Sequence, residues 1–451
     1  MNRNALCAVA LAIANTLSGC AQLQDHEKES AKSSIVTPIP QSWWYEFNDT
    51  ELNNLINTAL EMNLSIKSTE ARLLSYQYQL LSSESKLYPE LGGTFNQNFQ
   101  RGNLENRHSI DESKIGKIGL DARWDIDLFG KLKLSSKSQE YTYLENEQRL
   151  EQAKLILVSE LSKNWYNLIE ERTKESIITN QLLNSNKILK VGKQRYSMGL
   201  GSISTVLRQE QLINDLKSDL LDSKKEQRVI TKKINVLLGR EPDKLLSVNR
   251  LSMPTIESIS DEGIEASILE NHPAVKTAWY RYQSKSYLAK SMDKNRLPNI
   301  VITSDASKTS RDWNESFEIW KVGLGVKIDV PLFDMGRRNS DYKQHKALEE
   351  QALHEYTESI LETMLNVEMA LIQEQTQGEQ LKITKSQINK AQRVLDIELT
   401  KYSQGNLPFI DVLNAQEKLL RLQQREIEEH SQLIKRRITL YQSIGAGLKS
   451  S

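Results

Sequence analysis

Two stretches of the chain are nearly alike, and their positions decide how the rest folds. Arg195–Leu212 reads RYSMGLGSISTVLRQEQL, and Lys401–Leu419 reads KYSQGNLPFIDVLNAQEKL. Tyr196 and Tyr402 are 206 positions apart (402 − 196), and a Ser, a Gly, a Val and a Leu recur at the same offset. In each copy a glycine ends one periodic segment, and an apolar pair starts the next. We therefore expect two helical hairpins, related by a half-length repeat.

The arms of these hairpins are long and free of proline. Proline is absent between Glu90 and Glu241, and charged sequence with Leu/Ile spacing runs from about Leu132 to Tyr196. As one helix this segment would be roughly 95–100 Å long at 1.5 Å per residue. The pattern predicts a return helix over Ile203–Leu238 and a second long helix over Asn339–Tyr402.

Other segments alternate apolar and polar residues, as strands do. In Lys117–Leu128 the alternation continues over twelve positions, and Phe317–Val330 repeats it in the second half. Glu90–Gln100 is a weaker strand candidate, and Pro298 opens another. Twelve positions fit a transmembrane strand of about 9–11 residues better than a mean strand of about 5–6. The polar faces supply candidate lumen residues: Asp121, Arg123, Asp125, Lys321 and Lys327.

The first twenty residues resemble an export signal. They read MNRNALCAVALAIANTLSGC, with an apolar run shorter than a membrane-spanning helix. Leu17–Cys20 resembles the bacterial lipoprotein box, which implies that Cys20 carries lipid. We expect a signal peptide at residues 1–19, which is removed, and a lipidated tether at 20–49. A first structural repeat follows at 50–250, and a second repeat with a C-terminal tail at 251–451.

Composition argues against several classes of function. The 451 residues include 59 basic and 59 acidic ones, so nothing favours nucleic acid. Mean hydropathy is −0.53, and after the N-terminus no stretch approaches the ~20 apolar residues of a spanning helix. The six histidines form no i,i+4 pair, and no phosphate-binding loop or nucleophile elbow occurs. We expect no metal, no cofactor and no enzymatic activity.

Four amphipathic strands do not close a barrel alone, because about eight is the practical minimum. An open sheet in lipid would also leave its edge amides unsatisfied. Apolar stripes on the long helices, such as Leu155, Val158 and Leu161, need neighbours as well. We therefore expect several chains to share a mixed fold, a membrane β-barrel continued by a long α-helical barrel. Three chains would supply twelve strands, whereas two would give a barrel too narrow for cargo.

Taken together, these motifs resemble the TolC family of outer-membrane channels. The resemblance rests on the lipoprotein box, Trp43–Leu60, WDIDLFG at Trp124–Gly130, FDMGR at Phe333–Arg337, and the two hairpin tips. Within the family it favours the lipoprotein branch (OprM-like and NodT-like channels) that serves RND-type tripartite pumps. It implies a homotrimer, lipid-anchored in the bacterial outer membrane, with a tunnel of roughly 100 Å projecting into the periplasm. A periplasmic membrane-fusion (adaptor) protein would be the direct partner, and the inner-membrane pump an indirect one.

The resemblance also assigns residues at the tips. The acidic position of the second tip falls on Asp411, whereas the family's basic partner falls on Leu407, so its ion-pair latch is incomplete here. It implies gate residues at Tyr402, Asp411, Asn414 and Thr205. Small residues and exposed apolar groups predict adaptor docking around Gly199, Gly201, Gly405 and Leu407.

Asp411 is expected both to cap the last helix and to interact favourably with its dipole. In a trimer three copies would converge at the narrow end, which predicts a ring that attracts cations.

Two other functions fit parts of the pattern. The same duct could serve type I protein secretion, although the lipoprotein box favours efflux. A coiled-coil scaffold without a pore would explain the helices, but the long alternating segments argue against it.

Overall fold

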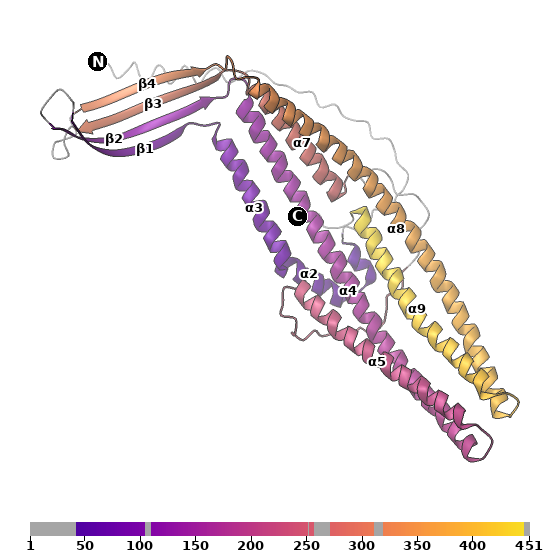
Figure 1. Ribbon diagram of the computed structural model, residues 1–451. Helices are drawn as coiled ribbons and strands as arrows, with labels where there is room; N and C mark the ends of the chain where they lie inside the picture. Colours follow the sequence, from indigo (N-terminus) through magenta and orange to yellow (C-terminus); the bar gives the residue numbers. More distant parts are fainter. Residues whose placement is uncertain (1–41, 104–109, 251, 257–270, 311–318, 446–451) are drawn as a thin grey trace. The chain divides into compact units, whose positions relative to one another are not determined.

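The computed structural model describes residues 42–103, 110–250, 252–256, 271–310 and 319–445 (Figure 1). All of them belong to the unit Pro40–Ser451, and the other unit, Met1–Ile39, lies outside the described residues. Cys20 and the predicted signal peptide therefore also lie outside them.

The order helix, two strands, long helix and return helix occurs twice along the described residues, and the first half has η1 and α2 in addition. In the first half a 3₁₀-helix and four α-helices flank two strands: η1 (Trp43–Phe47), α2 (Thr50–Met62), α3 (Leu64–Ser85), β1 (Glu90–Asn103), β2 (Ile110–Ile126), α4 (Lys131–Ser197) and α5 (Ile203–Leu237). The second half has α7 (Pro273–Lys294), β3 (Asn299–Ser310), β4 (Ile319–Asp329), α8 (Arg337–Ser403) and α9 (Phe409–Ile444).

The predicted helices are confirmed to within a few residues. α4 and α8 are each 67 residues long, or about 100 Å. Each starts after a left-handed glycine, Gly130 with φ 76° and Gly336 with φ 85°. Strand bounds were predicted less well, because β2 begins at Ile110 rather than Lys117. There the sequence no longer alternates, but backbone pairing with β1 continues to Asn103.

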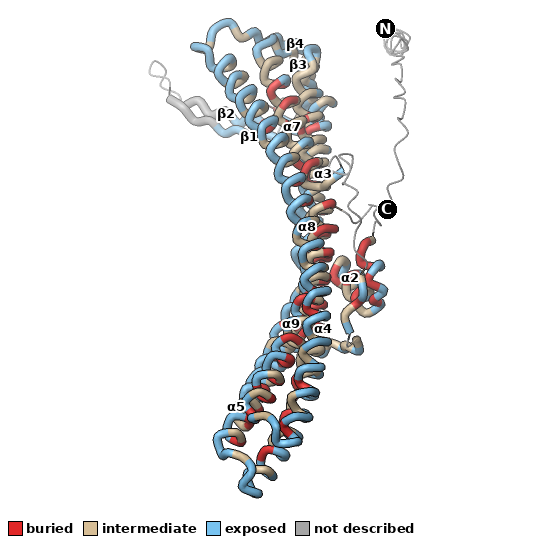
Figure 2. Tube along the Cα trace, turned by 90° about the vertical axis from the view of Figure 1, so that its right-hand side faces the viewer, coloured by how far each residue is buried: buried red, intermediate tan, exposed pale blue. Residues whose placement is uncertain are grey.

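The strands form one antiparallel sheet in the order β1-β2-β3-β4 (Figure 1). The helices pack as a layer in which α4 contacts α3, α5, α7 and α9, and α8 contacts α7 and α9. In Figure 2 most of α8 is exposed on the side that faces the viewer, whereas buried residues gather around α2 and along α4 and α9. Among the described residues, no helix combines the length and the apolarity needed to cross a membrane.

Helix α3 begins beside the end of the return helix α5, and α7 begins beside the end of the return helix α9. The Asn63 side chain caps α3 by accepting from Ser65 N and Ile66 N, and its amide donates to Leu237 O of α5 at 2.8 Å. Gly239 (φ 67°) passes so close that a Cβ there would lie 2.4 Å from Met62 O. At the other junction a Cβ on Gly445 would lie 2.7 Å from the ring of His272, the N-cap of α7.

An aromatic core holds η1 and α2 against the long helices. Trp43 stacks on Tyr441 at 5.4 Å between centroids, and Phe47 meets Tyr166 edge-on at 5.3 Å. Asp49 caps α2, because one carboxylate oxygen accepts from Leu52 N. The other accepts from Trp165 Nε1 at 2.8 Å, which ties the cap to α4.

Candidate functional site

The sheet has one polar and one apolar face, because paired residues on neighbouring strands point the same way. One row across the four strands contains Gly92, Asp121, Asp305 and Gly323. The five predicted lumen residues, Asp121, Arg123, Asp125, Lys321 and Lys327, all share this face in the register. The opposite face carries Leu120, Ala122, Val322, Leu324 and Val326.

Glycines on the outer strands make room for the paired carboxylates. A Cβ on Gly92 would lie 2.9 Å from Asp121 Oδ2, and one on Gly323 would lie 2.4 Å from Asp305 Oδ1. Asp121 therefore leans over β1 and Asp305 over β4, away from each other. Because like charges placed directly opposite each other destabilise a sheet, this arrangement relieves the repulsion. The face is thus charged and carries several small residues.

The first hairpin tip turns at Gly199, whose φ is 72°. Leu200 N donates to Arg195 O at 2.8 Å, and Ser202 caps α5 by accepting from Ser204 N. The tip leaves several large apolar side chains exposed: Met198, Leu200, Ile203 and Leu207. Sequence reasoning missed all four as exposed residues, although apolar residues in and beside a turn are themselves a signal of a partner.

The second tip turns at Gly405 (φ 80°) and has a core of its own. Tyr402 and Phe409 pack with ring centroids 5.0 Å apart, in a buried cluster with Val412 and Leu413. Leu407 is half-buried against this cluster, which leaves only part of its side chain open to the predicted docking surface. Proline at position 408 stiffens the turn and leads the chain directly into α9.

Arg195 joins the two tips. Its guanidinium lies 4.6 Å from the centre of the Tyr402 ring, and its Nη1 donates to Tyr402 O at 3.0 Å. That carbonyl belongs to the last turn of α8 and also accepts from Gly405 N at 3.0 Å. Tyr402 is therefore only 7% exposed, between Phe409 and Arg195.

The other predicted gate residues lie in the first turns of the two return helices or shortly after. Asp411 does not cap α9, because the N-cap is Pro408 and no side chain caps this helix. Its carboxylate is the acidic group of the first turn, where the helix dipole still favours it. Asn414 is exposed, one turn further along α9, and Thr205 is half-buried in α5.

A buried polar layer lies behind the tips, between three helices. Gln416 Nε2 of α9 donates to Ser185 Oγ of α4 at 2.8 Å, and Gln209 Nε2 of α5 donates to Ser185 O at 3.0 Å. Further along, Gln181 donates to Gln423 at 2.9 Å. These bonds fix the lateral register of the two hairpins.

Charged groups continue the contact between α4 and α9. Lys435 reaches Glu170 at 3.3 Å, and Lys174 reaches the other oxygen of the same carboxylate at 2.9 Å. Burial opposes the ionisation of Glu170, but Lys435, Ser431 and Lys174 outweigh it and hold the pKa of Glu170 below its usual value.

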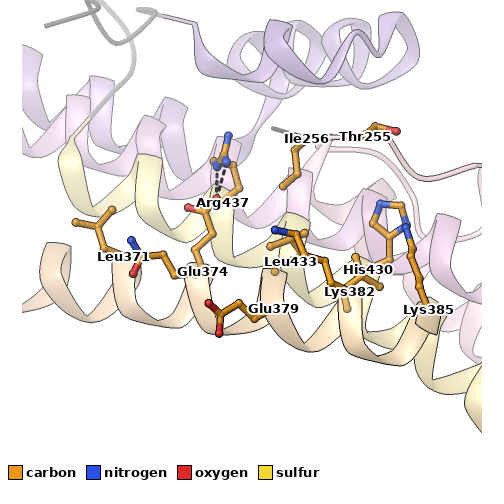
Figure 3. A pocket seen from close by; sticks show the side chains of 13 residues that line it. Thr255, Ile256, Leu371, Glu374, Glu379, Lys382, Lys385, His430, Leu433 and Arg437 are labelled. Atoms are coloured by element: carbon orange, nitrogen blue, oxygen red, sulfur yellow. Dashed lines mark hydrogen bonds and ion pairs between the residues drawn. The ribbon is translucent and has the colours of Figure 1, made fainter. Parts of the chain in front are cut away.

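Away from the tips, α8, α9 and the segment 252–256 line a pocket of about 470 Å³ (Figure 3). Arg437 and Glu374 point toward each other across it, with Nε and Oε1 2.7 Å apart. His430 Nε2 lies 3.1 Å from Pro254 O, and burial lowers the pKa of this imidazole. None of the predicted site residues that the structure describes lines the pocket. Among the described residues, no group of three or more His, Cys, Asp or Glu side chains is placed to hold a metal.

The fold is that of the outer-membrane channels. The solved structure of the outer-membrane channel OprN superposes with a TM-score of 0.84 at 21% identity, covering 95% of this chain and 99% of that one.

The sequence matches the family Outer membrane efflux protein over residues 55–240 and 266–446, and the chain belongs to this family. It is 22% identical to the cation efflux system protein CusC of Escherichia coli O157:H7 over 459 residues, which cover 96% of this chain and 97% of CusC. It is 21% identical to the pyoverdine export outer membrane protein OpmQ of Pseudomonas aeruginosa, over 96% of this chain and 93% of OpmQ.

Proposed function

We propose that this chain is the outer-membrane exit duct of a tripartite efflux system. In this role it passively conducts substrates from an inner-membrane RND-type pump and a periplasmic adaptor to the outside. The observation that carries the proposal is the sheet, charged on one face and apolar on the other, joined to two helices of about 100 Å. Family membership and the efflux functions named for CusC and OpmQ support it. The chain does no chemistry in this role.

The duct requires a homotrimer, because the polar face of one sheet encloses no lumen. The strand ends support closure by a three-fold axis. In the pairing register, Glu90 of β1 lies in the same row as Gly325 of β4. Strand β4 continues four residues beyond that row, to Asp329 (329 − 325). We place the start of the next subunit's β1 beside the end of β4, at Asp329, so that Asn98 of one subunit pairs with Lys321 of its neighbour.

Barrel geometry agrees with this register. We call the shift in strand register from one subunit to the next a step. A step of four residues tilts the twelve strands by about 35° from the barrel axis, close to the usual 35–45°. Steps of two and six give about 19° and about 46°. A step of four also brings Lys327 level with Gly92 of the next subunit, over which that subunit's Asp121 leans. A step of six would place Asp329 there instead, with the same sign of charge as Asp121.

Cysteine pairs test the barrel directly. Asn98→Cys with Lys321→Cys should link neighbouring subunits on oxidation, because paired strand residues meet the Cα spacing of a disulfide. Asn98→Cys with Gly323→Cys is the matched control for a step of six. Linkage of the control pair alone would reject the register and keep the barrel, and no linkage of either pair would reject both.

The tips are the periplasmic end in this proposal. Tyr402, Asp411, Asn414 and Thr205 form the gate, and the adaptor docks around Gly199, Gly201, Gly405 and the half-buried Leu407. The exposed side chains of Met198, Leu200 and Ile203 extend that docking surface. Cys20 carries the lipid anchor in the outer membrane, so that Cys20→Ser should abolish labelling with a fatty-acid probe.

The function is tested in the source bacterium by deleting the gene and restoring it on a plasmid. Deletion should raise intracellular accumulation of a fluorescent efflux substrate, and the wild-type gene should restore export. The purified protein should be retained on the immobilised adaptor encoded beside the pump. Unchanged accumulation together with loss of a secreted protein would overturn the proposal in favour of type I secretion.

A further inference from the structure

We propose that Tyr196, exposed at the first tip, is covered by Lys401 of a second copy of this chain, and that this contact yields when the channel opens. The inference rests on the trimeric duct proposed above and adds which residues meet between subunits. It starts from a contact within one chain, where Arg195 of the first hairpin covers Tyr402 of the second.

The two hairpins are equivalent by sequence at a constant offset of 206. α4 and α8 begin at 131 and 337 and end at 197 and 403, and the tip tyrosines are 196 and 402. Under this offset Arg195 corresponds to Lys401, and Tyr402 to Tyr196. The contact between Arg195 and Tyr402 therefore has a counterpart, Lys401 with Tyr196. These two residues belong to the outer sides of the hairpin pair.

Burial shows that this counterpart is incomplete within one chain. Tyr402 is 7% exposed but Tyr196 is 46% exposed. Leu413 of α9 is 4% exposed, whereas its equivalent in α5, Leu207, is 57% exposed. The same holds for Ile427 of α9 and Leu221 of α5, which are 6% and 69% exposed. At these two positions α9 is buried and α5 is open.

The missing neighbour is identified by the repeat. Within one chain α4 packs on α9, α5 packs on α4, and α8 packs on α9, so that α5 and α8 are the outer members (Figure 1). Ile188 of α4 packs against the core of the second tip, and its equivalent on α8, Val394, is 47% exposed. α8 thus carries the surface that α5 lacks. Packing α8 on α5 of a second copy repeats the contact of α4 with α9, and three copies close the ring.

The two kinds of contact differ in strength. Arg195 uses a planar guanidinium both to stack on the ring and to donate to Tyr402 O. Lys401 carries a compact and strongly hydrated ammonium, which interacts as a point charge. The polar layer is also weaker across subunits. Ser185 and Gln416 correspond to Ala391 and Glu210, and the alanine side chain cannot form the hydrogen bond that the serine does. The contacts between subunits are therefore the ones that separate first.

The partner assignment is tested with a short thiol cross-linker on the full-length oligomer in detergent. Glu210→Cys with Ala391→Cys should link different chains, whereas Ser185→Cys with Gln416→Cys should link within one chain and leave its mass unchanged. Single-cysteine variants control for Cys20. Failure of the first pair beside success of the second would overturn the inference, and native mass spectrometry of the same samples would show separately whether the trimer exists.

The opening step is tested by conductance in planar bilayers. Lys401→Ala should raise open probability by roughly two- to thirtyfold for each subunit contact that breaks on opening, the range that a cation–π contact of about 0.5–2 kcal/mol corresponds to. Tyr196→Ala should do the same, and the double variant should add little. Lys401→Arg should lower open probability below that of the wild type. Additive effects of the two alanine variants, or an unchanged Lys401→Arg channel, would contradict the proposed contact.

Discussion

The two hairpin tips have nearly the same sequence but different surroundings. At the second tip, Tyr402 and Phe409 are buried in a core closed by Arg195. At the first tip, Tyr196 and Ile203 are exposed at the equivalent positions. One tip is complete within the chain and the other is not. In the proposed trimer, every first hairpin obtains its second neighbour from another subunit.

The largest expected effect comes from truncating the core of the complete tip. Phe409→Ala removes a side chain that is 6% exposed, and should cost about 3–5 kcal/mol of stability. The matched Ile203→Ala acts on an exposed side chain and should cost less than about 1 kcal/mol in the dissociated chain. Thermal unfolding of both variants in detergent measures the difference. Equal losses would show that the two tips are equally packed.

Exchanging the basic residues of the tips sharpens the comparison. Arg195→Lys keeps the charge but loses the planar fork, and should cost about 1–2 kcal/mol because the ring contact and the bond to Tyr402 O weaken together. Arg195→Ala should cost more. Urea unfolding of the dissociated chain gives these values. A neutral Arg195→Lys variant would mean that the charge alone closes the second tip.

Charge at the start of the return helices distinguishes the tips in conduction. Asp411→Ala should reduce cation selectivity and weaken block by multivalent cations, because three carboxylates leave the narrow end. Thr205→Asp places a carboxylate at the equivalent position of the first tip, and should strengthen the block. Planar-bilayer recordings on the trimer measure both. Unchanged block in both variants would place these residues away from the ion path.

The smallest effect concerns pH. Burial lowers the pKa of His430 below its ordinary value of about 6.5, so the folded state prefers the neutral ring. Its contribution to stability is fully present above about pH 6.5, and is lost as the pH falls toward the lowered pKa. His430→Gln should make the melting temperature less dependent on pH between about 7.5 and 5.5. His354→Gln, on α8 outside the pocket, is the control. An identical pH profile in wild type and His430→Gln would remove His430 from this account.

The sequence predicted the helices well and the details of the sites less well. The long proline-free periodic segments predicted the ends of α4 and α8 to within two residues, because helix propensity and hydrophobic pattern agree along them. β2 was drawn too short, since backbone pairing extended it past the alternating segment. Asp411 was expected to cap α9, but the turn at Pro408 starts the helix earlier.

Contacts between distant segments could not be predicted from the sequence. The stacking of Arg195 on Tyr402 depends on the register of the two hairpins along each other, which the polar layer around Ser185 and Gln416 fixes. The row of Gly92, Asp121, Asp305 and Gly323 likewise depends on the pairing of β2 with β3. Such registers join residues more than a hundred positions apart and leave no local pattern.

Thiol labelling at position 207 tests most directly whether another subunit completes the first tip. Leu207→Cys should react slowly with a maleimide in the assembled oligomer, and rapidly once the subunits are dissociated without unfolding. Met198→Cys, at the end of the turn, should react rapidly in both states. Rapid labelling of Leu207→Cys in an oligomer shown by native mass spectrometry to be intact would contradict the account.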